Sequence, residues 1–158
     1  MNGELTNYQS RAIRALVLLH ERHLRDFVQV WRQAKKGGVV LPVTGEDQYR
    51  SLENLLLHVF QSGRQYLARM CEHLGRPDPE LAEPPSPGDI EAQAGPYCEY
   101  LLGRWRTVLT DVQDSELEPE VYTPGMHYWI DAMLEHAVMH PIRHEFQLRE
   151  LQEAQGRA

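Results

Sequence analysis

Cysteine is scarce in this chain of 158 residues, which contains only Cys71 and Cys98. The two do not form the Cys-x-x-Cys spacing of a zinc ribbon or a redox motif, and they are too few for a disulfide framework. No cluster of cationic residues flanks either position to activate the thiol. The sequence therefore predicts two packed, reduced thiols.

Long hydrophobic runs and long basic runs are missing as well. The uncharged apolar stretch near the start, Ala15 to Leu19, is far too short for a secretion signal or a membrane span. The net charge is -7 and the longest basic run is Lys35-Lys36, so the chain lacks the positive surface that binds a phosphate backbone. We expect a cytoplasmic protein with no membrane and no nucleic acid among its partners.

Strand-like alternation is absent, whereas four long stretches carry apolar residues at helical spacing. Segments rich in proline and glycine separate them, at 35–45, 75–88 and 114–125. A chain of this length suits one compact domain, which buries roughly two-thirds of its unfolded surface. Connections of this length join antiparallel neighbours, so the expected fold is all-α, a single antiparallel four-helix bundle over residues 1–158.

Local sequence indicates where the last two helices begin. A capping hydroxyl followed by a first-turn proline occurs at residues 86–87 and again at 123–124. The third helix is expected to kink at Pro96 and Gly103, and the fourth to extend to about Glu153.

Histidine is plentiful, with eight residues, and helical bundles build metal centres from side chains that face inward. At about 100° per residue, His140 and His144 fall on or beside the apolar stripe of the last helix, and His136 falls on its flank. His20 lies on the apolar side of the first helix and is expected to be a hydrogen-bonded core residue. His58 lies at the edge of the buried sector of the second helix, so periodicity permits an inward orientation without requiring it.

Two interpretations of the His140 and His144 pair are open at this point. Neutral imidazoles at i and i+4 project from one helix face about 6 Å apart, which suits one divalent transition-metal ion. Buried, hydrogen-bonded histidines would give the same spacing, and chance also produces such pairs in a histidine-rich chain. An inward histidine from another helix would favour the metal.

Other known metal sites are excluded by the sequence. A carboxylate-bridged di-iron bundle needs Glu-x-x-His, and none of the eight histidines has a glutamate three residues earlier. A zincin needs His-Glu-x-x-His, whereas Glu135 precedes His136 and points away from the apolar stripe. The chain also lacks a haem-attachment motif and a glycine-rich nucleotide loop.

Two segments resemble the DinB/YfiT-like superfamily of metalloenzymes. The second helical stretch has a mid-helix histidine in SLENLLLHVFQSGRQYL, and the last reads HAVMHPIRHEFQL, similar to the family pattern His-x-x-x-His-x-x-Gln-Ile/Leu. The element order agrees over essentially the whole chain. The resemblance implies a DinB-like bundle in which His58, His140 and His144 bind one metal ion, with Gln147 matching the motif's glutamine. Pro141 lies between two of these ligands and is expected to kink the helix.

The resemblance further implies a metal-dependent enzyme. Imidazole ligands favour zinc or nickel, with iron and manganese as alternatives. Three neutral histidines leave coordination positions open, as catalytic sites do. The family includes transferases and isomerases that use low-molecular-weight thiols such as bacillithiol and mycothiol, so the expected partner is a small-molecule substrate or a thiol cofactor.

Two alternative functions stay open: a metal-dependent hydrolase, and a non-catalytic bundle that binds metal or associates with itself, as a homodimer, or with another protein. Hydrolysis ranks second because no carboxylate lies on the histidines' side. Around the helix axes, Glu145 lies about 100° from His144 and Glu53 about 140° from His58. Asn54 lies only about 40° from His58 and is the candidate partner for its ring or for a bound water.

Overall fold

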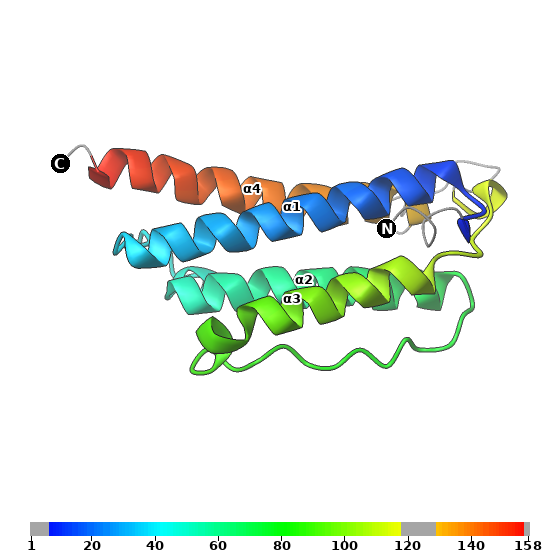
Figure 1. Ribbon diagram of the computed structural model, residues 1–158, viewed down its shortest axis with the longest axis horizontal. Coiled ribbons are helices and arrows are strands. Elements are labelled where there is room, and N and C mark those ends of the chain that lie inside the picture. The colour runs from blue at the N-terminus through cyan, green and yellow to red at the C-terminus, as the bar shows by residue number, and fades with distance from the viewer. Residues whose placement is uncertain (1–6, 118–128, 157–158) are drawn as a thin grey trace.

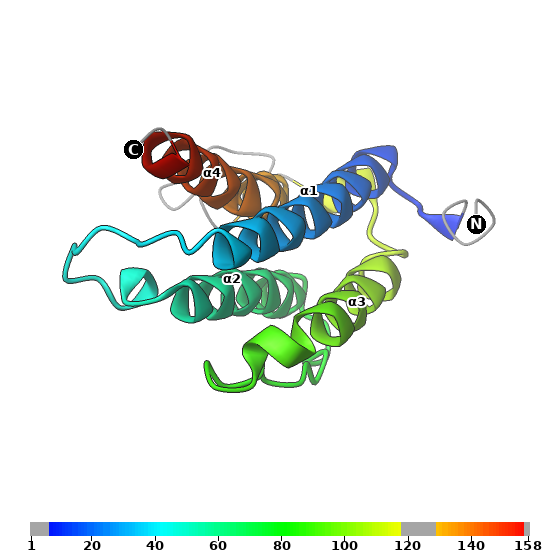
Figure 2. The same ribbon diagram turned by 60° about the vertical axis from the view of Figure 1, so that its left-hand side comes forward.

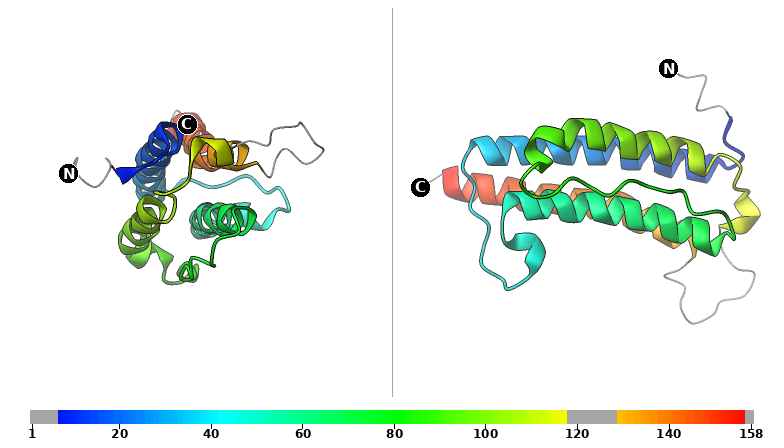
Figure 3. Two further views of the ribbon diagram at one scale, coloured as in Figure 1. Left: turned by 90° about the vertical axis from the view of Figure 1, so that its right-hand side faces the viewer. Right: turned by 90° about the horizontal axis from the view of Figure 1, so that it is seen from below.

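The computed structural model describes residues 7–117 and 129–156. These residues form helices without any strand, in agreement with the all-α prediction (Figure 1): α1 (Arg11–Lys36), η2 (Asp47–Tyr49), α2 (Leu52–His73), α3 (Ile90–Val108), η3 (Asp114–Glu116) and α4 (Ile130–Gly156). Seen along the long axis, the four α-helices form a bundle (Figure 3, left). None of the described helices is long and apolar enough to cross a membrane.

The helices run in two directions, with α1 and α4 pointing one way and α2 and α3 the other (Figure 1). Residue numbers increase in the same direction on both helices: Phe60 of α2 contacts Tyr97 of α3, and further along Gly63 of α2 accepts a hydrogen bond from Trp105 of α3. These two consecutive helices are therefore parallel. The expectation that each connection joins antiparallel neighbours is wrong for this pair.

The connection between α2 and α3 explains this direction. Residues 74–89 contain no helix and return along the length of the bundle (Figure 3, right). An extended chain of that length can span about 50 Å, whereas the α2 helix rises only about 33 Å. A proline-rich segment that resists helix formation can thus return the chain to the end where α2 began.

Serine side chains cap the first two long helices. Ser10 Oγ accepts a hydrogen bond from the Ile13 backbone N–H at 3.2 Å, and Ser51 Oγ accepts one from Asn54 at 3.1 Å. Each cap satisfies one of the N–H groups that a helix start leaves without an intrahelical partner.

The start of α3 differs from the prediction. Residues 86–87 belong to a turn in which the Ile90 N–H donates to the Ser86 carbonyl at 2.9 Å, and the helix itself begins at Ile90. Ser86 Oγ donates to the Asp89 carboxylate at 2.8 Å, so it does not cap the backbone. The helix then continues unbroken through Pro96. The predicted start of the last helix, at 123–124, lies outside the described residues.

Two tryptophans anchor the core between the helices. Trp31 and Trp105 are each 1% exposed, yet both indole N–H groups are satisfied, by the carbonyls of Leu52 at 2.6 Å and Gly63 at 3.1 Å. At Gly63 a Cβ atom would lie 3.2 Å from the Leu101 side chain. Glycine at this position therefore permits the close approach of α3.

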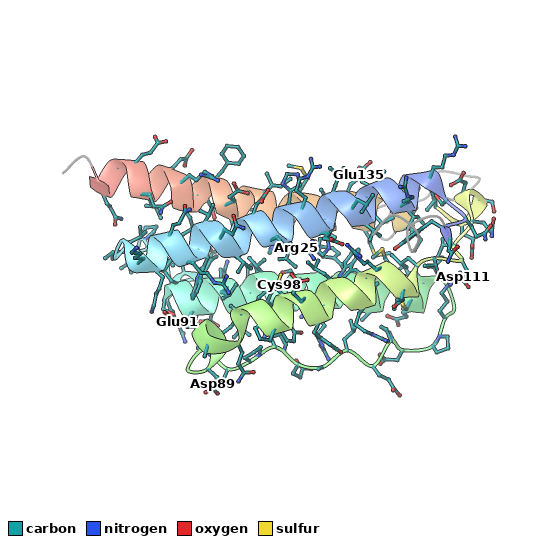
Figure 4. All side chains as sticks on the ribbon, viewed as in Figure 1. Arg25, Asp89, Glu91, Cys98, Asp111 and Glu135 are labelled. Atoms are coloured by element: carbon teal, nitrogen blue, oxygen red, sulfur yellow. The ribbon has the colours of Figure 1, made fainter. Side chains whose placement is uncertain are left out.

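A buried carboxylate joins α1 to α3. Glu21 is only 6% exposed and accepts hydrogen bonds from Arg106 at 2.6 and 2.5 Å and from Arg25. Arg25, on the side of α1 that faces α3 (Figure 4), also binds Glu99 through contacts of 2.9 and 2.8 Å. Burial alone would raise the pKa of Glu21, but the bonds from the two guanidinium groups outweigh it and hold the pKa below its ordinary value.

We expect Glu21→Gln to lower the free energy of unfolding by roughly 1–3 kcal/mol, because the neutral amide leaves two guanidinium groups without their buried carboxylate. The measurement is the midpoint of urea denaturation at neutral pH. Glu99→Gln is the matched control, since that exposed partner of Arg25 should contribute at most about 1 kcal/mol. Equal losses from the two variants would contradict a special role for the buried carboxylate.

Candidate metal centre

Three histidine side chains converge between α2 and α4. The ligand atoms of His58, His140 and His144 all lie within 4.8 Å of one another, and among the described residues they form the one such cluster of histidine, cysteine, aspartate or glutamate. The Nε2 atoms of His58 and His140 are 3.0 Å apart. The structure therefore brings together the three residues named from the sequence; their binding of a metal stays a prediction.

The antiparallel packing of α2 against α4 produces this convergence. His58 lies against the turn that holds His140 and His144, with ring centroids 4.8 and 5.3 Å away. Tyr66, about two turns beyond His58 on α2, contacts His136, one turn before His140 on α4, with ring centroids 6.4 Å apart. His136 is exposed and lies outside the cluster, in keeping with its position on the flank of the apolar stripe.

Pro141 lies between two members of the cluster without breaking α4. The helix extends from Ile130 to Gly156, and Pro141 is among its buried residues. The rings of His140 and His144 remain 4.7 Å apart across it. Although Pro141 has no backbone N–H to donate to the helix, the two imidazoles still point toward the same region.

The spacing of the ring nitrogens fits a metal ion. Two nitrogens bound tetrahedrally to one zinc ion, at about 2.0–2.1 Å each, lie about 3.3 Å from one another. The observed 3.0 Å between the Nε2 atoms of His58 and His140 differs from this by a few tenths of an ångström. A direct N–H···N hydrogen bond between neutral rings gives the same distance. The third imidazole is what a metal site would require in addition, because a hydrogen bond between two rings needs no third ring.

Gln147 fixes the protonation of His144. Its Oε1 atom lies 2.7 Å from Nδ1 of His144 and also accepts a hydrogen bond from the Tyr49 hydroxyl at 3.2 Å. An amide oxygen can only accept, so Nδ1 of His144 carries the proton and Nε2 keeps its lone pair. Histidines that bind metals are usually oriented by such a partner on the other ring nitrogen.

Tyr49 is a site residue that sequence reasoning missed. It belongs to η2, a short turn without helical periodicity, and its ring centroid lies 6.2 Å from that of His144. Periodicity cannot place a loop residue, and no spacing rule links it to Gln147, which is 98 positions away. Ser62 was missed as well; its Oγ lies 3.3 Å from Nε2 of His140.

Other polar residues considered from the sequence are engaged elsewhere. The Asn54 side-chain amide donates to Ser51 Oγ at 3.0 Å, so it supports the helix cap and does not serve as the partner of His58. Glu145 forms an ion pair with Arg149 at 2.9 Å. Outside the cluster, His20 is a core histidine as predicted, but its buried Nδ1 has no hydrogen-bond partner.

Burial keeps the three imidazoles of the cluster neutral. It lowers the pKa of His140 to about 3, with further lowering by the positive charges of neighbouring histidines and Arg143. It lowers the pKa of His144 to about 4, although the Gln147 bond opposes the change. The pKa of His58 is lowered too, first by burial and then by Arg143. Neutral imidazole is the form that binds a metal, so the lone pairs are available at neutral pH.

Comparisons of this chain with models of protein families, with curated proteins and with solved structures find no match. The case for the site therefore depends on the geometry of the cluster and on the two segments that resemble the DinB/YfiT-like pattern.

The free energy of unfolding of the metal-free protein should fall as the pH drops below about 6.5. His140 and His144 have pKa values below the ordinary 6.5 when folded, so between 6.5 and about 4 the unfolded chain binds more protons. Each contributes up to about 1.4 kcal/mol per pH unit in that window. Urea denaturation in the presence of chelator measures the slope, and His144→Asn should make it shallower. Identical slopes would show that His144 is not held neutral.

Gln147→Leu should weaken metal binding about 10- to 100-fold, because His144 loses the acceptor that fixes its tautomer. Zinc competition with a chromophoric chelator measures the affinity. Gln65→Leu is the control, since Gln65 is an exposed residue of α2. Unchanged affinity in Gln147→Leu would exclude the orienting role.

Proposed function

We propose that His58, His140 and His144 bind one divalent transition-metal ion and that the protein is a metal-dependent enzyme. The observation that carries the proposal is the convergence of three neutral imidazoles from two helices, with ligand atoms within 4.8 Å. Nitrogen ligands of this kind favour zinc or nickel, with iron and manganese as alternatives. The DinB-like character of the bundle, inferred from the two quoted segments, supports the same assignment.

Three histidine ligands leave coordination positions open for a substrate. A metal bound there would lower the pKa of a coordinated water or thiol toward neutrality. The chain's own groups prepare the site. Burial keeps the imidazoles unprotonated, Gln147 retains the proton on Nδ1 of His144, and Tyr49 holds Gln147 in place. The Ser62 hydroxyl, 3.3 Å from His140, is a further polar group beside the cluster.

The lack of a carboxylate within the histidine cluster supports thiol transfer or isomerisation over hydrolysis; Glu46, whose charge opposes the lowering of the His58 pKa, is not part of the cluster. Among the described residues, no aspartate or glutamate belongs to the histidine cluster. Glu145 is paired with Arg149, and Glu53 with Lys35. A hydrolase would need a base to activate water, whereas a thiol ionises more readily and needs less assistance. We therefore propose an S-transferase or isomerase that uses a low-molecular-weight thiol, with metal-dependent hydrolysis as the alternative.

A non-catalytic role is favoured by a different observation. Met139 and Phe146 are 56% and 61% exposed on α4, and large apolar residues of this kind occur at sites of association. Self-association through α4, as a homodimer, is therefore the second candidate function. For either role we place the protein in the cytoplasm, because its two cysteines are unpaired and buried, as expected in a reducing compartment.

Protein purified without an affinity tag should contain one metal ion per chain, and His58→Ala, His140→Ala and His144→Ala should each abolish binding. His136→Ala is the matched control and should only weaken it, because His136 lies outside the cluster. Metal should raise the free energy of unfolding by roughly 2.7 kcal/mol at a hundredfold excess over Kd. Elemental analysis and thermal melts with and without chelator measure both quantities.

The outcome separates the proposed functions. Equal loss of metal from His136→Ala would mean that the ligand set is wrong, and no metal after dialysis against zinc or nickel would favour the non-catalytic role. Metal-loaded protein should consume bacillithiol or mycothiol in the presence of an electrophile. The His144→Ala variant is the negative control and should not consume the thiol.

A further inference from the structure

An apolar cavity of about 440 Å³ lies beside the histidine cluster, between the segment that follows α1 and the C-terminal half of α4. We propose that it binds the apolar body of the second substrate, the uncharged molecule that reacts at the metal centre with the thiol. This inference deepens the proposed function and rests on it. Its walls include Leu41, Tyr49, Leu55, Gln147, Leu151 and Ala154.

The cavity lies next to the histidine cluster along the same two helices, α2 and α4. On α4, Gln147, Leu151 and Ala154 follow His144 at intervals of three or four residues and so lie on one helix face. On α2, Leu55 precedes His58 by one turn. The distance along α4 from His144 to Leu151 is about 10 Å. A ligand seated in the cavity and extended along α4 would therefore reach toward the cluster.

Two side chains belong to both places. Tyr49 and Gln147 line the cavity, and the Tyr49 hydroxyl and Nδ1 of His144 share the Oε1 atom of Gln147. Their hydrogen bond forms the polar end of a cavity whose other walls are largely aliphatic. Small-molecule sites commonly have this composition, an apolar enclosure with a few placed polar groups, and the volume is within their usual range.

The charge of the lining identifies the class of ligand. Glu150 is the one charged residue among the lining residues, and no lysine or arginine is among them. The cation whose charge reaches all three histidines, Arg143, is also not part of the lining. A carboxylate-bearing thiol would meet only negative charge here, so the cavity suits an uncharged alkyl or aromatic group. Val40 and Val43, 71% and 103% exposed in the same segment, extend the apolar surface next to it.

The test uses straight-chain hydroxamic acids, from acetohydroxamate to octanohydroxamate, with the zinc-loaded protein. The hydroxamate head binds the metal and the chain reports on the cavity. Affinity measured by calorimetry should rise about fourfold per methylene until the cavity is filled. Affinity that is independent of chain length would overturn the proposal.

Ala154→Trp should remove the dependence on chain length, because the indole occupies the rim of the cavity. Ala154 is exposed near the end of α4, so the larger side chain does not disturb the core. The matched control is Ala92→Trp, an exposed position on α3 that does not line this cavity, and it should keep the full dependence. A chain-length dependence that survives in Ala154→Trp would place the alkyl chain elsewhere and overturn the proposal.

A metal-free experiment separates this inference from the proposed function. Heptan-1-ol titrated into the apo protein should shift the methyl resonances of Leu41 and Leu151, whatever the state of the histidines. Shifts at both leucines, together with a failure of every hydroxamate to bind, would support the cavity and count against the metal centre. Unshifted leucine methyl groups would overturn the cavity proposal even where acetohydroxamate binds the metal.

Discussion

Burial of imidazole rings between α2 and α4 is the constraint on which the rest of the site depends. Removal of water makes the protonated form costly, so the rings stay neutral at neutral pH. Neutral rings packed this closely need their remaining N–H groups satisfied. Gln147 meets that need for His144, whereas Nδ1 of His140 is buried without a partner. The polar groups of the cluster are thus satisfied at His144, whereas one buried ring nitrogen of His140 has no hydrogen-bond partner.

Burial alone does not identify a site, as a comparison with His20 shows. His20 is 1% exposed, its pKa is lowered to about 3, and its Nδ1 has no hydrogen-bond partner, features that it shares largely with His140. Yet its ring stacks on Trp105, with centroids 4.1 Å apart, and within residues 7–117 and 129–156 it belongs to no group of potential ligands. Convergence of several donors therefore distinguishes a candidate metal centre from a histidine that fills space in the core.

Helical periodicity predicted much of this architecture, and its failures have definite causes. The four helices and the inward position of His144 follow from apolar spacing, which records burial directly. Periodicity did not determine the orientation of His58, because this residue lies at the edge of the buried sector of its helix. Only the packing of α4 against α2 determines what surrounds it. The direction of α3 could not be predicted, since a long extended connection permits either one. The role of Tyr49 could not be predicted, because it depends on a contact with Gln147, 98 positions away in the sequence.

The separation of the three clustered histidines along the chain has a consequence for folding. His58 and His140 are 82 positions apart, with all of α3 and the long return segment between them. Joining such distant points costs loop entropy, so the three-ligand cluster forms only when α4 has docked on α2. A nascent chain that still lacks α4 contains only His58 of the three histidines and would not bind a metal ion tightly. If the proposed site binds a metal, uptake would therefore follow the docking of α4, and the bound ion would slow the separation of α4 from the folded bundle.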